Sequence, residues 1–309
     1  MAVALKSVVA TGVSGAERLR TWLLAQRWFS GVLLPSMPRR LRWTLRRIYL
    51  APLDAAERMA GVSDETAPAR SSNFTGAVSD FKASGEALRQ RLVDQAGLAP
   101  HSRVLDIGCG LGRLGAALTD FLDESGRYEG VDIVPAGIRW CQENISSAHN
   151  NVHFTLADIY NKEYHPNGTL KASEFKFPFD DETFDLAVLI SVFTHMLTED
   201  TENYIQEVSR VLRPGGICFA TFYLLTPDIM DRMNAPDATY NFKYRFGTHW
   251  ATSKAVPELT VGYEAAFMRK RYDAFGFAAE LHPGSWRRGG GADGQDLLIG
   301  RKLRINSVG

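Results

Sequence analysis

A run of glycines at residues 106–115, Asp-Ile-Gly-Cys-Gly-Leu-Gly-Arg-Leu-Gly, constrains the fold more than any other feature of the sequence. It follows a short apolar stretch at 103–107 and precedes a segment with helical periodicity at 112–122. Glycine lets a backbone turn tightly and approach a ligand to a distance that any Cβ would block. A strand that enters a helix through such a turn is typical of nucleotide-binding α/β sheets.

The rest of the chain alternates between apolar strands and amphipathic helices. The pattern predicts further strands at 128–133, 152–156, 184–190 and 217–222, with helices between them that include 135–145 and a helix at 198–212 that Thr198 caps. Strands and helices alternating at this length predict a parallel, doubly wound sheet. In such sheets ligands bind at the carboxyl ends of the strands, so the residues just after each strand are the candidate site.

The carboxylate in front of the glycines decides between two ligands. Gly110-x-Gly-x-x-Gly115, with Asp132 following Gly110 by 22 residues, also fits the fingerprint of a dinucleotide site. Asp106 would repel a pyrophosphate there but attract the ammonium group of a methionine. The charge therefore favours S-adenosylmethionine over NAD.

At this point the sequence resembles the class I S-adenosylmethionine-dependent methyltransferases, small-molecule enzymes of types 11 and 25. The resemblance extends over residues 81–222. Five motifs carry it in order: Asp106-x-Gly-x-Gly, Asp132 after the second strand, Leu156-Ala-Asp158-Ile, Phe184-Asp185 and Leu212-Arg-Pro-Gly-Gly216. It implies a Rossmann-like sheet of seven strands, closed by a hairpin at 278–282 and 296–301 whose last strand is antiparallel.

The resemblance also implies roles for individual residues. Asp132 would accept both ribose hydroxyls, since a carboxylate has two acceptor oxygens. Asp158 would accept from the adenine amine. The donor site would be completed by loop residues Gly108, Cys109, Gly110 and Gly112. Ile133 and Ile159 would pack on the two faces of the adenine ring, and Ser191 and Val192 would lie beside the methionine part.

A general base is needed only if the acceptor loses a proton. His195 follows the fourth strand and is the predicted base, with His249 and His282 as second choices. The alternative is that His195 only packs or orients its loop.

Two segments depart from a minimal member of this family. They are an insert at 160–178 and an aromatic stretch at 224–260. The second predicts a lid over an apolar acceptor or, alternatively, a packed subdomain, followed by a helix at 263–275. Predicted acceptor residues are Tyr160, Tyr164, Tyr244, His249 and Trp250.

The N-terminal region differs in charge from the rest of the 309 residues. Residues 1–50 have a net charge of +8, whereas the whole chain has none. We predict an extension at 1–60 with short amphipathic helices at 20–24 and 41–50, a linker at 61–80 and a catalytic domain at 81–309. The extension is a layer on the catalytic domain, a peripheral contact with a membrane, or a presequence.

Composition narrows the class of protein further. The neutral overall charge predicts no nucleic-acid partner, and three separated cysteines predict neither a disulfide framework nor a metal site. We expect a cytoplasmic enzyme, with contact to a membrane as an option. The leading hypothesis is O-methylation of a lipid, glycolipid or natural product. The alternatives are N- or C-methylation of a small molecule, an NAD-dependent oxidoreductase and a silent binding module.

Overall fold

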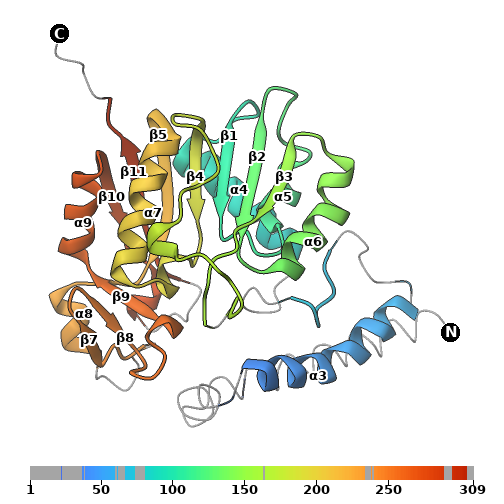
Figure 1. Cartoon of the computed structure of the whole chain (residues 1–309), viewed down its shortest axis with the longest axis horizontal. Coiled ribbons are helices and arrows are strands. Elements are labelled where there is room, and N and C mark those ends of the chain that lie inside the picture. The colour runs from blue at the N-terminus through green and yellow to red at the C-terminus, as the bar shows by residue number, and fades with distance from the viewer. Residues whose placement is uncertain are drawn as a thin grey trace. The chain divides into compact units, whose positions relative to one another are not determined.

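The computed structural model divides the chain into two compact units, Met1–Ser84 and Gly85–Gly309 (Figure 1). It describes residues 39–59, 67–73, 81–162, 164–233, 240–288 and 294–304, with residues 22, 37, 61 and 238. Within these residues, no helix combines the length and the apolar character that crossing a bilayer requires.

The first unit contains one long described helix, α3 (Arg39–Met59). The predicted helix at 41–50 is part of it, whereas the one at 20–24 falls outside the described residues apart from Trp22. Asp54 of α3 accepts hydrogen bonds from the backbone N–H groups of Arg70 and Ser71, and Glu57 pairs with the Arg70 guanidinium. The turn at 67–73 is thereby bonded to the C-terminal half of α3.

The second unit is built on the predicted seven-stranded sheet, which is confirmed. The strands are β1 (Arg103–Ile107), β2 (Arg127–Asp132), β3 (Val152–Leu156), β4 (Phe184–Leu189), β5 (Leu212–Phe222), β10 (Phe277–His282) and β11 (Asp296–Lys302). Their order is β10-β11-β5-β4-β1-β2-β3, and β11 is antiparallel to both neighbours. The strand order reverses between β1 and β4, which is where ligands of such sheets bind.

Each buried strand contributes side chains to two hydrophobic cores, one on each face of the sheet, because successive side chains point to opposite faces. On β4, Ala187 and Leu189 join one core, which includes side chains from α7 (Thr198–Val211) and α9 (Ala265–Ala274). Leu186 and Val188 join the other, with side chains from α4 (Phe81–Ala96), α5 (Arg113–Leu118) and α6 (Pro135–Asn144). The sheet is therefore covered by helices on both faces.

The aromatic stretch at 224–260 contributes to a second, smaller sheet of order β6-β9-β8-β7. Its strands are β6 (Leu224–Leu225), β7 (Tyr244–Phe246), β8 (His249–Ala251) and β9 (Val261–Glu264), with α8 (Pro227–Arg232) after β6. Phe242 is fully buried beside it, in a cluster with Tyr223 and Trp286. Closure of this region as a lid stays a prediction.

Two predicted helices have different limits in the structure. The helix predicted at 263–275 starts only at Ala265, because Tyr263 and Glu264 pair with β6 as part of β9. The helix predicted at 112–122 ends at Leu118, where the Thr119 hydroxyl donates back to the carbonyl of Ala116.

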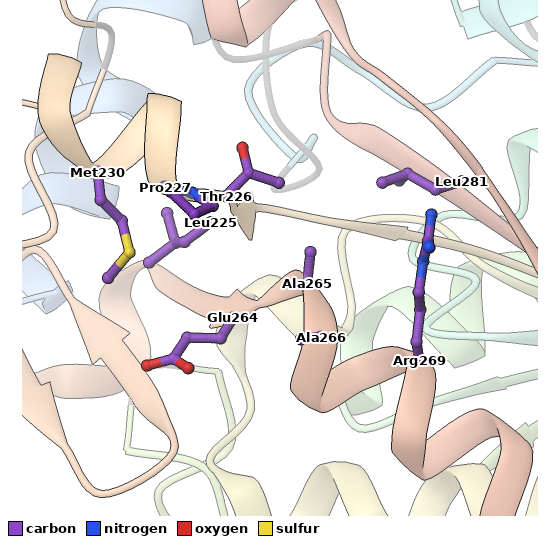
Figure 2. Close-up of a pocket in the computed structure, with 9 residues that line it drawn as sticks. All are labelled: Leu225, Thr226, Pro227, Met230, Glu264, Ala265, Ala266, Arg269 and Leu281. Atoms are coloured by element: carbon purple, nitrogen blue, oxygen red, sulfur yellow. The ribbon is translucent and has the colours of Figure 1, made fainter.

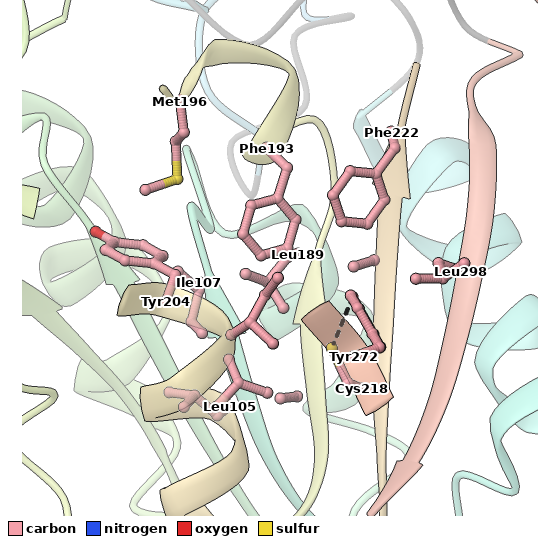
Figure 3. Packing of buried hydrophobic residues seen from close by; sticks show 14 of the residues in the cluster. Leu105, Ile107, Leu189, Phe193, Met196, Tyr204, Cys218, Phe222, Tyr272 and Leu298 are labelled. Carbon is pink, nitrogen blue, oxygen red and sulfur yellow. Dashed lines mark hydrogen bonds between the residues drawn. The ribbon is translucent and has the colours of Figure 1, made fainter. Parts of the chain in front are cut away.

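The core also anchors the loop that follows β4. Phe193 begins the short 3₁₀ helix η4 (Phe193–His195) and is fully buried. Its ring stacks on Phe222 at the end of β5, with centroids 4.7 Å apart and planes 8° apart (Figure 3). This stack fixes the segment that carries His195.

Candidate active site

The glycine loop lies at the carboxyl end of β1 and has no room for side chains at two of its positions. Gly108 has φ +74°, and a Cβ there would lie 2.5 Å from Cγ2 of Val192. Gly112 has φ +73°, and its Cβ would lie 2.8 Å from the Phe154 ring. Gly108 is therefore required for the loop to pack against the chain after β4, and Gly112 for it to pack against β3.

Asp132, the last residue of β2, holds this loop in place. One carboxylate oxygen accepts the backbone N–H of Gly110 and the other accepts that of Val134, both at 2.8 Å. Burial raises the pKa of Asp132 to about 6, although these backbone hydrogen bonds oppose the shift. The predicted ribose-binding acid is thus also the support of the loop.

Asp106 lies one residue before the end of β1 and is buried. The Tyr128 hydroxyl donates to one of its oxygens at 2.7 Å. Burial raises the pKa of Asp106 to about 6, while Tyr128 and Arg113 oppose that shift. A buried carboxylate of this kind gains most from a cationic partner, since its charge is poorly solvated.

Asp158 follows β3 and is bound by the insert. The Thr169 hydroxyl donates to one oxygen at 2.6 Å, and Nε2 of His165 lies 2.8 Å from the other. The hydrogen bond from Thr169, followed by that from His165, lowers the pKa of Asp158. Sequence reasoning missed both partners, because nothing in their local pattern indicates that the insert folds back on Asp158.

The covers predicted for the adenine ring differ in exposure. Ile133 is half-buried, whereas Ile159 is buried and bridges through its backbone to Leu170. Tyr160, predicted to meet the acceptor, is exposed beside them. The roles of these residues toward a ligand stay predictions.

Ser191, two residues after β4, has a backbone conformation that is rare for a residue with a side chain. Its φ is +60°, and such strain is common where a site is held by its surroundings. Its N–H donates to the Thr221 hydroxyl at 2.8 Å, and its own hydroxyl donates to the Gln295 side chain at 3.1 Å. Gln295, just before β11, therefore reaches the segment that follows β4.

His195 is oriented by a backbone carbonyl. Its Nδ1 lies 3.0 Å from the carbonyl oxygen of Glu258. A carbonyl only accepts, so Nδ1 carries the hydrogen and Nε2 is the basic nitrogen of the neutral ring. The Tyr164 ring meets the imidazole edge-on, with centroids 5.8 Å apart, so the structure brings together a predicted base and a predicted acceptor residue.

The smaller sheet holds the start of α7 near His195. Thr198 was expected to cap α7, but the N-cap is Leu197, and the Thr198 hydroxyl instead lies 2.9 Å from Nδ1 of His249. Tyr263 donates to the carbonyl of Met196 at 2.8 Å, and its hydroxyl lies 2.9 Å from that of Thr201. Burial lowers the pKa of His249, which favours its neutral form.

The other predicted acceptor residues and the last candidate base are more scattered. His249 and Trp250 are neighbours on β8 and so face opposite sides of the smaller sheet. Tyr244 is exposed on β7, paired with Ala251. His282 ends β10, the edge strand three positions from β4, with Glu280 3.5 Å away. The structure thus separates His282 from the end of β4.

A hollow of about 390 Å³ lies between α8 and α9 (Figure 2). Leu225, Pro227 and Met230 lie on one side of it, and Arg269 and Leu281 on the other. Among the described residues, those predicted to hold the donor do not line it. The hollow is therefore separate from the candidate active site.

Residues 105–220 match the family model described as a methyltransferase domain. This segment of the chain is a methyltransferase domain. The predicted resemblance to the class I S-adenosylmethionine-dependent methyltransferases is confirmed, and S-adenosylmethionine is the cofactor of that class.

Curated relatives of this methyltransferase domain include methyltransferases that are named after lipid substrates. The chain is 26% identical over 204 residues to a sterol 24-C-methyltransferase of Candida albicans, covering 61% of this chain and 49% of that protein. It is 32% identical over 114 residues to a phthiotriol/phenolphthiotriol dimycocerosates methyltransferase of Mycobacterium leprae, covering 37% and 35%. The chain thus spans between a third and a half of the length of these relatives.

Solved structures similar to the methyltransferase domain are more distant in sequence. The YcgJ protein from Bacillus subtilis superposes with a TM-score of 0.45 at 16% identity, covering 72% of this chain and 99% of that one. A putative O-methyltransferase from Nostoc punctiforme gives 0.48 at 17% identity, covering 72% and 56%.

The methyltransferase domain fits S-adenosylmethionine by the chemistry of its own residues. Asp106 offers a buried negative charge at the end of β1, directly before the glycine loop. Asp132 offers carboxylate oxygens suited to a vicinal diol. A pyrophosphate would instead meet two buried carboxylates.

Proposed function

We propose that the chain is an S-adenosylmethionine-dependent methyltransferase that methylates a hydroxyl group of a small apolar molecule. The orientation of His195 carries this proposal: its Nδ1 is engaged by the Glu258 carbonyl, at the strand end next to the glycine loop. The proposed acceptor class is a lipid, glycolipid or natural product. A cytoplasmic location remains a prediction.

The residues divide the work between donor and acceptor. Asp106 and Asp132 would hold the ammonium group and the ribose, and Ser191 and Val192 would border the methionine part. When bound, the donor supplies a methyl group whose bond to sulfur breaks as its bond to the acceptor oxygen forms. His195 Nε2 takes the proton that the hydroxyl loses, while the Glu258 carbonyl stabilises the imidazolium that results.

The apolar character of the acceptor is supported by what surrounds His195. The ring of Tyr164, a half-buried residue, lies against the imidazole. An aromatic surface of this kind excludes water and suits an acceptor with an apolar body.

A second candidate is methylation of carbon. The sterol relatives named above are C-methyltransferases by their printed names. A base at His195 also suits that reaction, because carbon loses a proton after methylation. The two reactions differ in the bond that forms, so product analysis separates them.

The direct test is donor-dependent labelling of a cell extract with S-adenosylmethionine carrying a labelled methyl group. We expect one class of labelled, organic-soluble product, in which NMR shows the methyl group bonded to oxygen. The His195→Ala variant is the matched control and should label that product far more slowly. A methyl group on carbon supports the second candidate, and label that stays in the donor contradicts both.

A further inference from the structure

Helix α3 of the first unit exposes a row of apolar side chains. Leu41, Leu45, Ile48 and Met59 are 46%, 44%, 65% and 79% exposed. Their spacings of four, three and eleven residues place them on one face of a helix with 3.6 residues per turn. We call these four residues the α3 stripe.

The charges of α3 are arranged around this stripe. The helix contains six arginines but only two acids, Asp54 and Glu57. Asp54 follows Leu45 by nine residues, which is about 180° around the helix. There it is bonded to the turn at 67–73, and Glu57 pairs with Arg70 of the same turn.

The two acids are thus directed away from the α3 stripe, whereas Arg47 and Arg58 are exposed to one side of it. An apolar face bordered by arginines is typical of helices that lie in the plane of a membrane interface. Clustered arginine is also attracted to anionic headgroups.

We propose that α3 binds an anionic lipid surface, with the α3 stripe inserted among the acyl chains and the arginines at the headgroups. The net charge of +4 on the helix sequence favours an anionic membrane over an apolar protein surface. This inference does not rest on the proposed methyl transfer, since it concerns binding alone. It would bring the enzyme to membrane-borne acceptors.

The test is cosedimentation of the full chain with vesicles of phosphatidylcholine, alone or with one third phosphatidylglycerol. We expect the anionic vesicles to bind at least about 10-fold more tightly, with the difference shrinking at high salt. Ile48→Glu should weaken that binding by at least about 10-fold. Leu303→Glu is the matched control, because it removes a residue that is 51% exposed in the other unit and adds the same charge; it should change binding by less than about two-fold.

A second variant keeps the apolar stripe and removes charge. Arg47→Gln/Arg58→Gln should weaken binding to anionic vesicles by about 10-fold and leave binding to neutral vesicles unchanged. Unchanged vesicle binding by Ile48→Glu overturns the proposal. If Ile48→Glu lowers the melting temperature without changing vesicle binding, the catalytic unit covers the α3 stripe. If it dissociates a dimer in analytical ultracentrifugation, a second copy of the chain covers the α3 stripe. Either result overturns the membrane assignment.

Discussion

The donor side and the acceptor side of the candidate site are assembled in different ways. On the donor side, Tyr128 of β2 bonds to Asp106 of β1, and Gly110 of the loop after β1 bonds to Asp132 of β2, each across 22 residues. On the acceptor side, the partners lie much farther apart in sequence: 51 residues for Thr198 and His249, and 63 for His195 and Glu258. The donor side is a sequence motif, whereas the acceptor side exists only once the smaller sheet has folded.

This difference predicts that the two sides can be damaged separately. His195→Ala should lower the rate of methyl labelling by about 100-fold or more, because no group at that position then takes the proton. Donor affinity should stay within a few-fold, since His195 belongs to the acceptor side. Initial rates in the labelled extract and calorimetry of the donor measure the two effects.

His282→Ala is the control, because that histidine lies on the edge strand. It should leave the labelling rate unchanged. Labelling by His195→Ala at the wild-type rate would show that this histidine only orients its loop.

Substitutions on the donor side should instead lower the affinity for the donor. Asp132→Ala removes the acceptor for Gly110 N–H and Val134 N–H, and we expect donor affinity to fall by about 50-fold. Asp158→Ala should lower donor affinity only about five-fold, because that carboxylate is half-exposed and already bonded to side chains of the insert at 160–178. Calorimetry with both variants ranks the two acids, and equal losses would contradict the supporting role of Asp132.

Donor affinity should also depend on pH through the donor side alone. Burial raises the pKa of Asp106 and of Asp132 to about 6. Both carboxylates therefore take up protons as the pH falls through 6, and a protonated Asp106 no longer attracts an ammonium group. For one such group, affinity should drop about 10-fold from pH 7 to pH 5.

Asp106→Asn should bind the donor weakly at both pH values and show a flatter profile. A wild-type affinity that is constant between pH 7 and pH 5 would contradict ionisation of the pair.

The smallest effect is expected for Tyr263, which supports the acceptor side through its hydroxyl. Tyr263→Phe removes the hydroxyl that donates to the carbonyl of Met196, just before α7, and that contacts the hydroxyl of Thr201 in the first turns of α7. We expect stability to fall by about 1–2 kcal/mol in thermal unfolding and the labelling rate to fall by about three- to ten-fold. Donor affinity should not change, and a loss of donor affinity would show that the two sides are coupled.

The same division explains what the sequence could predict. The positions of β1 to β4 along the chain follow from apolar patterns and from motifs that act over short distances. The Asp158 contacts with His165 and Thr169, the Glu258 carbonyl at His195 and the Thr221 hydroxyl at Ser191 leave no such pattern. Tyr263 was assigned to a helix because its own segment is amphipathic, and only the pairing of β9 with β6 and β8 overrides that tendency.

We infer that the glycine loop and Asp106 form a site for the cationic methionine group of the donor. Calorimetry of the purified chain with S-adenosylmethionine and, separately, with NADH tests it most directly. We expect S-adenosylmethionine to bind at least about 100-fold more tightly than NADH, since the pyrophosphate of NADH would face two buried carboxylates. Tight binding of NADH together with no binding of S-adenosylmethionine would contradict it.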